Sequence, residues 1–153
     1  MAWHPQKSRY IVEHLHKYSG NPDRITARSA PERTLMKFFD TNANVKKWNS
    51  EGVVVHYISP VDGERHRYIV DFYAELVDGT KLLIEYKPYD HTIPPTPPKK
   101  QTKKSREQYE FALRRWAVNQ AKWAAAKAYA EKIGVKFAVW TEQHLRALGM
   151  RVL

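Results

Sequence analysis

The sequence predicts one α/β domain in which a central mixed sheet is flanked by helices, in the order α-βββ-α-β-α. Three observations predict this class. A helical pattern precedes three alternating strand patterns, a long alanine-rich helical pattern follows them, and one more apolar strand comes after that helix. A chain of 153 residues, 42% of them apolar, can form one core, so we treat residues 1–153 as a single domain.

The first element that the sequence predicts is a helix that begins after Ser29. Residues 1–28 before it are polar and indicate an N-terminal arm or irregular lead-in. Serine at the N-cap, proline in the first turn and Glu32 three residues on form a capping box. Apolar side chains then recur at helical spacing: Leu35, Met36 and Phe39. We expect this helix to end within residues 40–44, where side chains that compete for backbone hydrogen bonds cluster.

Three segments then alternate apolar and polar residues, as half-buried strands do. They are residues 53–58, 67–76 and 81–87. An Asp-Gly pair separates the last two, which indicates a hairpin. A two-residue turn would face the apolar sides of the two strands opposite ways, because a one-residue slip flips every side chain. A three-residue loop makes the apolar sides coincide, and it places Asp71 directly opposite Glu85.

The remainder of the chain predicts a loop, a long helix, a strand and a last short helix. Residues 88–104 hold five prolines followed by a basic cluster, which is typical of a stiff, extended loop. A helix follows from about Ser105 to Ile133, and Gly134 is a natural stop. Residues 135–140 form a buried strand, after which Thr141 caps the last helix.

The charge balance favours an anionic partner. Twenty-six lysines and arginines against 16 acidic residues give a net charge of +10, so nucleic acid is the first candidate. The absence of cysteine excludes disulfides, zinc–thiolate sites and thiol catalysis. No stretch approaches the roughly 20 apolar residues of a membrane span, and the start of the chain lacks the apolar run of a signal peptide. We therefore expect a soluble basic domain without a membrane partner.

Asp71, Glu85 and Lys87 form the candidate catalytic set, on the polar face of the predicted sheet. Two neighbouring carboxylates repel each other, which is tolerated where they share a divalent cation. A lysine beside them suits orienting a water molecule or stabilising charge on a phosphate. These are the requirements of metal-assisted phosphodiester hydrolysis, and oxygen ligands without cysteine indicate Mg²⁺ or Mn²⁺. The alternative interpretation is an ordinary ladder of charged side chains on a strand surface.

Two further polar residues have both a structural and a functional interpretation. Glu32 occupies the capping position, yet it shares the apolar stripe of its helix and could reach the same ion. Gln120 lies between Trp116 and Trp123 on one helical stripe, either near the metal or as a satisfied core glutamine. Lys122 is the alternative to Gln120, although it fits the helical phase less well.

The five residues of the basic cluster are candidate DNA contacts: Lys99, Lys100, Lys103, Lys104 and Arg106. In a domain with a +10 charge, beside the presumed catalytic strand, they suit phosphate groups. The alternative is that they only solvate the loop.

The candidate residues resemble the core of PD-(D/E)xK nucleases, with Glu32 on a first helix, Asp71 after an apolar pair and Glu85-Tyr86-Lys87 ending a strand. Val70 stands where that pattern has proline. Nearly the whole chain is also similar to the head completion nucleases of tailed bacteriophages. The matching segments include Lys17-Tyr18, Gly20-Asn21-Pro22, Arg28-Ser29, Trp48, His66-Arg67-Tyr68, Asp71-Phe72-Tyr73, Lys87-Pro88 and Asn119-Gln120-Ala121-Lys122-Trp123.

The resemblance implies a restriction-endonuclease-like fold and a magnesium-dependent DNA endonuclease that acts in phage head completion, after DNA packaging. Asp71, Glu85 and Glu32 would hold Mg²⁺ or Mn²⁺, with Lys87 positioning water and Gln120 near the metal. Its partners would be DNA and portal or neck proteins, in the host cytoplasm during assembly or with the virion. Two alternatives stay open: a non-catalytic DNA- or portal-binding head-completion protein, and a resolvase or transposon-end nuclease.

Overall fold

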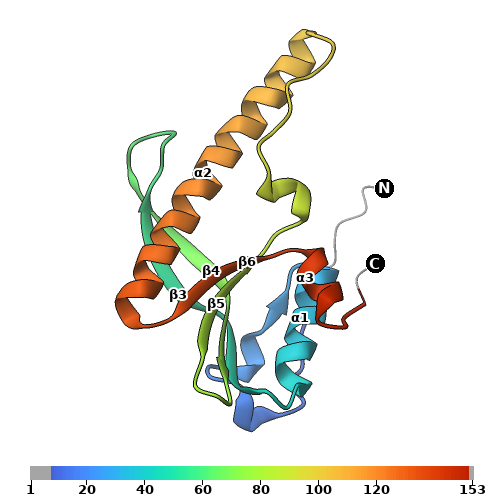
Figure 1. Cartoon of the computed structure of the whole chain (residues 1–153), viewed down its shortest axis with the longest axis vertical. Coiled ribbons are helices and arrows are strands. Elements are labelled where there is room, and N and C mark those ends of the chain that lie inside the picture. Colours follow the sequence, from blue (N-terminus) through green and yellow to red (C-terminus); the bar gives the residue numbers. More distant parts are fainter. Residues whose placement is uncertain (1–7, 152–153) are drawn as a thin grey trace.

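The computed structural model describes residues 8–151, and residues 1–7 and 152–153 lie outside the described part. Its centre is a four-stranded mixed sheet in the order β3-β4-β5-β6 (Figure 1). The strands are β3 (Val45–Ile58), β4 (Arg65–Leu76), β5 (Lys81–Tyr86) and β6 (Lys136–Trp140). The first three strands pair antiparallel, and β6 pairs parallel to β5. The predicted α-βββ-α-β-α order and mixed sheet are confirmed.

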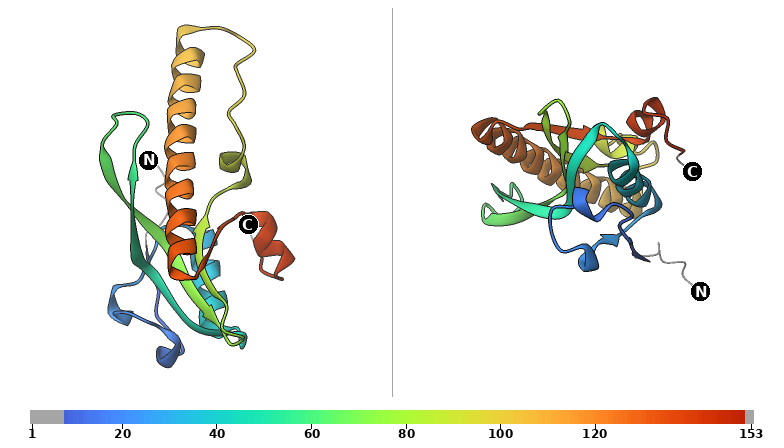
Figure 2. Two further views of the ribbon diagram at one scale, coloured as in Figure 1. Left: turned by 60° about the vertical axis from the view of Figure 1, so that its left-hand side comes forward. Right: turned by 90° about the horizontal axis from the view of Figure 1, so that it is seen from below.

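Helices cover both faces of the sheet. The short α1 (Ala30–Thr41) and the N-terminal segment lie on one side, and the long α2 (Lys103–Ile133) lies on the other (Figure 2). The first half of α2 extends beyond the sheet, with the proline-rich segment beside it. The last helix, α3 (Glu142–Ala147), follows β6. Among residues 8–151, no helix is long and apolar enough to cross a membrane.

The N-terminal segment is part of the core, so the expectation of a separate arm is wrong for residues 8–28. Two short strands, β1 (Ser8–Arg9) and β2 (Thr26–Ala27), pair with each other, and two 3₁₀ turns lie between them: η1 (Leu15–Lys17) and η2 (Pro22–Arg24). The rings of Tyr10 and Tyr18 pack edge-on against the fully buried Trp48 of β3. Burial of the aromatic side chains outweighs the polar composition of the segment, because hydrophobic stabilisation follows the apolar area removed from water.

The predicted β4–β5 register is confirmed. Phe72 pairs with Ile84, and the Leu76 amide donates to the Thr80 carbonyl at 2.7 Å. Gly79 takes a φ of 91°, the left-handed conformation that this three-residue loop requires. The expectation of a polar face is wrong, however, because α2 packs there and apolar side chains line it. A second core forms between α2 and the face of the sheet opposite Phe72. It includes Leu83 of β5, Ala126 and Ala130 of α2, and Val135.

Strand β3 begins eight residues earlier than the sequence predicts. Two irregularities explain the difference, because the register against β4 shifts between Val45 and Lys47 and again between Ser50 and Val53. Each shift breaks the alternation by which a strand is recognised. At the second shift Glu51 has a φ of 56°, a left-handed conformation that is uncommon for a residue with a side chain.

The other predicted boundaries agree with the structure to within two residues. Thr102 caps α2 through a hydrogen bond from the Ser105 amide, so the helix begins at Lys103 rather than Ser105. Gly134 ends it with a φ of 76°. Residues 88–102 form a connection whose only helical turn is η3 (Tyr89–Thr92), and Thr141 caps α3 as predicted.

Candidate active site

Asp71 and Glu85 lie side by side where β4 and β5 leave their regular pairing. The ladder between the strands ends at Phe72 and Ile84, one residue short of the two acids. Asp71 accepts a hydrogen bond from the Tyr86 amide at 2.9 Å. Glu85 is 5% exposed, and its Oε2 accepts a hydrogen bond from Trp123 Nε1 of α2 at 3.4 Å. The expected carboxylate pair is therefore present, but it is covered by α2 rather than open to solvent.

The Asp71 carboxyl has a pKa well above its usual range. Burial is the largest cause, and the neighbouring Glu85 carboxylate adds to it through repulsion and a shared hydrogen bond. The Tyr86 amide opposes the shift, and the charge of Glu32 adds to it. A buried acid pair of this kind binds a proton or a cation, because two negative charges in a low-dielectric site cannot both stay unbalanced.

Glu32 lies near this pair and also caps its helix, so both of its interpretations have a structural basis. Ser29 Oγ donates to Glu32 Oε1 at 3.3 Å, and the Arg28 amide donates to Oε2 at 3.4 Å. Burial raises the pKa of Glu32, the Arg28 amide and Ser29 hydrogen bonds oppose this, and the Glu51 charge raises it further. Arg28 forms an ion pair of 2.7 Å with Glu51, the residue of β3 with the left-handed backbone.

Lys87 follows β5 and is half-buried. Its amide donates to the Trp140 carbonyl of β6 at 2.9 Å, so the backbone two residues after Glu85 is held by the sheet. Its charge acts on His91 of η3: burial, Arg115 and Lys87, in that order, lower the pKa of the His91 imidazole, and Asp90 opposes them. Lys87, His91 and Arg115 therefore form one basic group beside the end of β5.

Gln120 lies on one stripe with Trp116 and Trp123, as expected, but its side chain is exposed, so the interpretation as a satisfied core glutamine is wrong. The buried amide is that of the preceding residue, Asn119, which is 6% exposed. It is on the same stripe as Ala126 and Ala130, seven and eleven residues later, the spacing of one helical face. Gln120 instead lines a hollow with Trp123, the residue that binds Glu85.

Tyr68 and Trp123 are two neighbours of the site that sequence reasoning did not assign to it. The Tyr68 hydroxyl is buried without a hydrogen-bond partner among the described residues. Burial raises its pKa, and the Glu85 and Asp71 charges raise it further. Lys122 of α2 lies 5.6 Å from the centre of the Tyr68 ring, a cation–π contact. The available signal was a polar aromatic residue at an inward position of β4, three residues before Asp71.

The five basic residues expected to contact DNA are all exposed, around the start of α2. They lie at the end of the helix that extends beyond the sheet (Figure 1). Ser105 at their centre precedes Trp123 by 18 residues, which corresponds to about 27 Å along an α-helix. The cluster is therefore separated from the carboxylates by more than the width of a helix pair.

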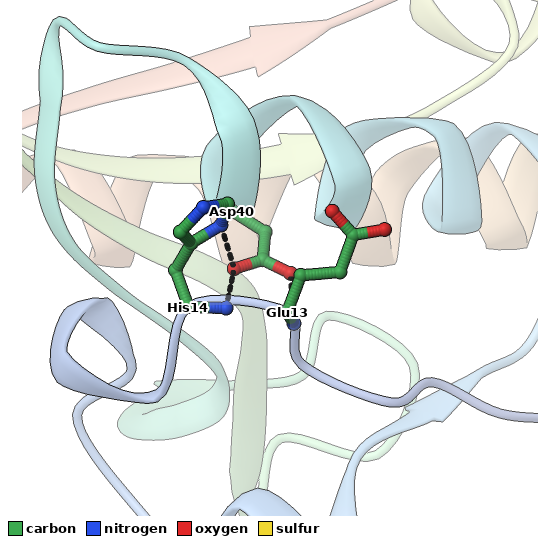
Figure 3. A group of neighbouring side chains, drawn as sticks. All are labelled: Glu13, His14 and Asp40. Atoms are coloured by element: carbon green, nitrogen blue, oxygen red, sulfur yellow. Dashed lines mark hydrogen bonds and ion pairs between the residues drawn. The ribbon is translucent and has the colours of Figure 1, made fainter.

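A second acidic group, formed by Glu13, His14 and Asp40, has a structural explanation (Figure 3). Among the described residues, only this group brings three metal-ligating side chains within 4.8 Å of one another. The fully buried Asp40 carboxylate accepts hydrogen bonds from the Tyr10 hydroxyl (2.8 Å) and from the Glu13 and His14 amides (2.7 and 3.0 Å). Burial raises its pKa, but these bonds outweigh burial and leave the pKa low. Asp40 thus ties residues 10–14 to the end of α1.

Comparisons with known proteins identify the family of the chain. The model of the "TnsA-like endonuclease N terminal" family matches residues 42–142, which include both central carboxylates and Lys87. A curated protein, the "Head completion nuclease" of Enterobacteria phage T4, is 35% identical over 143 residues, covering 94% of this chain and 95% of its own length. With the mixed sheet flanked by helices, the family match confirms the expected restriction-endonuclease-like fold. The chain therefore belongs to the TnsA-like family of endonucleases.

Proposed function

We propose that this protein is a divalent-metal-dependent DNA endonuclease that acts in phage head completion, with Asp71 and Glu85 as its metal ligands. The observation that supports it best is the buried carboxylate pair at the end of the β4–β5 ladder. Folding brings the two acids together at a cost in free energy, and such a cost is retained where the acids perform a reaction.

The residues at the pair fit a hard cation. The two carboxylates supply oxygen only, and the raised pKa of Asp71, caused first by burial and then by Glu85, is consistent with a site that a cation would stabilise. Oxygen ligands suit Mg²⁺ or Mn²⁺. When bound, such an ion polarises a phosphate and lowers the pKa of a coordinated water. Glu32 completes the set of acids, although it stands outside the 4.8 Å spacing of a compact three-ligand group.

The chain's own residues would then orient the attacking water and the substrate. Lys87 holds the attacking water or the scissile phosphate, from a backbone that β6 fixes. The Tyr86 amide orients the Asp71 carboxylate, and the Tyr86 carbonyl offers a further oxygen ligand. Trp123 orients Glu85 through its indole N–H. Gln120 would lie near the metal, on the rim of the hollow beside Trp123.

The substrate is DNA in this proposal. The net charge of +10 suits a polyanion, and the five basic residues around the start of α2 contact the backbone away from the cut. Because the head completion nuclease of phage T4 matches this chain over nearly the full length of both, we place the activity in virion assembly, after packaging. The host cytoplasm is then the location, and portal or neck proteins are the partners, with retention in the virion as one outcome.

Cleavage assays test the proposal. Linear and supercoiled DNA are incubated with Mg²⁺, Mn²⁺, Ca²⁺ or EDTA, and the full chain is compared with Asp71→Ala and Lys87→Ala. We expect cleavage with Mg²⁺ or Mn²⁺ and a loss of at least about 100-fold in both variants. Matched controls are Glu75→Gln on the same strand as Asp71 and Lys81→Ala on β5, the strand that Lys87 follows.

Two results would contradict the proposal. Activity that survives Asp71→Ala would show that other carboxylates hold the metal. A folded full chain that binds DNA without cutting it under any metal condition would favour a non-catalytic DNA- or portal-binding protein.

A second candidate is a resolvase or transposon-end nuclease, which the TnsA-like family match favours. It shares the chemistry and differs in substrate. Competition between branched and linear DNA separates the two: preference for branched DNA by a dimer supports the second candidate, and equal cleavage by a monomer supports head completion.

A further inference from the structure

A pocket of about 280 Å³ lies between η3 with the residues that follow it and the middle of α2. Asp90 and His91 line it from η3, and Arg115, Trp116 and Asn119 line it from α2. Trp116 also lines the neighbouring hollow that contains Trp123, the residue bound to Glu85. The pocket therefore adjoins the candidate active site through two tryptophans on one helix face.

The side chain of Asn119 indicates that this pocket binds a ligand. It is 6% exposed, and none of the hydrogen bonds between described residues uses its side chain. Among the described residues, its amide atoms are not among the fully buried polar atoms that lack a partner, so they open into the pocket rather than into the core. Alanine, as at Ala126 and Ala130, would fill this helix face without polar atoms, so the carboxamide is available to a ligand. A carboxamide offers two donors and one acceptor, a combination that matches the edge of a nucleobase.

The other walls supply the remaining parts of a nucleotide site. Trp116 provides an aromatic surface for stacking, and such contacts tolerate every base. Arg115 and His91 lie on the same pocket, and Lys87 is close enough to act on His91. The lining thus combines an apolar part with a basic part that outnumbers its one acid, Asp90, and its volume of about 280 Å³ is just below the usual range of small-molecule pockets.

We propose that this pocket holds one unpaired nucleotide of the strand that is cut, with its base against Trp116 and Asn119 and its phosphate toward Arg115. The inference rests on the proposed nuclease function and names the form of DNA that the site selects. Unstacking a paired base costs a few kcal/mol, whereas a frayed end, flap or gap presents the base already free. DNA with an unpaired nucleotide beside the cut is therefore the preferred substrate.

Binding measurements in Ca²⁺, without cleavage, test the pocket. The probes are a short duplex with one unpaired 2-aminopurine nucleotide and the same duplex fully paired. We expect the full chain to bind the first probe at least about 10-fold more tightly than the second, and to change the fluorescence of its 2-aminopurine. Trp116→Ala and Asn119→Leu remove about 10-fold and 5-fold of the affinity for the unpaired probe, and they leave the paired duplex unchanged. Gln108→Leu, an exposed amide on the same helix, is the matched control.

Asn119→Leu keeps or raises the melting temperature if the amide has no structural partner, and a marked fall would overturn the proposal. Equal losses on both probes, or equal affinity of the full chain for both, would also overturn it. If the chain cleaves DNA but shows no preference for the unpaired probe, the pocket proposal fails while the nuclease proposal stands. Absence of cleavage with the preference retained would fail only the nuclease proposal.

Discussion

The carboxyl group of Asp71 has a higher pKa in the folded chain than in the unfolded chain, where water solvates it and Glu85 is distant. Between a pH near 4, the usual pKa of an aspartate, and about 9, the folded chain binds the additional proton. Stability falls with rising pH wherever the folded state holds more protons than the unfolded state. The free energy of unfolding should therefore decrease across this range when no metal is present.

We predict that Asp71→Asn removes much of this decrease. The amide keeps the shape of the side chain without its charge, so at pH 8 in EDTA the variant should be more stable by roughly 2 kcal/mol, although it is inactive. Thermal unfolding at several pH values between 4.5 and 9 measures the effect. An equal gain in stability at pH 4.5 and pH 8 would contradict the assignment to Asp71 ionisation.

Asp40 should behave in the opposite way. Its carboxylate is stabilised by the Tyr10 hydroxyl and two amides, so its pKa is lowered and its stabilising contribution is lost as the pH falls below the unfolded value. Asp40→Asn should cost about 2–4 kcal/mol at pH 7, because it leaves buried donors without an acceptor.

The accompanying loss should be local. Residues 10–18 of the Asp40→Asn variant should become sensitive to protease and exchange their amide hydrogens faster, while Tyr10→Phe shows a smaller effect. Metal-dependent cleavage by the folded variant should persist. A loss of metal binding with the segment still protected would instead make the Glu13, His14 and Asp40 group the metal site.

At the scale of an element, α2 joins two functions along one helix. Its second half packs on the sheet through Ala126 and Ala130, and its first half extends beyond the sheet with the basic cluster at its start. The first turn of α2 contains no acidic residue, and its basic side chains interact unfavourably with the positive end of the helix dipole. The arrangement suits a phosphate partner more than it suits the stability of the helix.

We predict that replacing the five basic residues of this cluster with alanine lowers the salt dependence of DNA binding. Each lost phosphate contact should reduce the slope of log affinity against log salt concentration by about 0.9. Fluorescence anisotropy at several salt concentrations measures it, with Lys127→Ala and Lys132→Ala, exposed near the other end of α2, as the control. An unchanged slope would remove the cluster from the binding surface.

At the scale of the whole molecule, the basic cluster and the carboxylates define the length of DNA that the protein covers. About 27 Å separates them along α2, which corresponds to about 8 base pairs at 3.4 Å each. Duplexes that extend at least this far from the cut should be cleaved faster than shorter ones.

We predict that the cleavage rate at limiting DNA rises with duplex length up to this value and then levels off. A series of duplexes from about 4 to 16 base pairs on either side of the cut measures it. The variant without the five basic residues should lose this dependence on length. A full chain whose rate is the same for every duplex would show that the cluster does not contact the DNA that is being cut.

The sequence by itself predicted the order of the elements, the β4–β5 register and the pairing of Asp71 with Glu85. Local patterns determine these features, because Ser29 caps a helix through its own neighbours, and a strand buries one side chain in two. The choice of a three-residue loop followed from matching the apolar sides of two adjacent segments, which needs no knowledge of distant residues.

Only the tertiary structure decided which surfaces those elements share. The packing of α2 over the acid pair, the burial of Asn119 rather than Gln120, and the inclusion of residues 8–28 in the core depend on contacts between distant segments. The physical reason is that the pattern of one helix does not determine which part of its surface a distant segment covers, and therefore which polar residue is buried. Bulges in β3 likewise arise from its pairing with β4, and the patterns of single segments do not contain them.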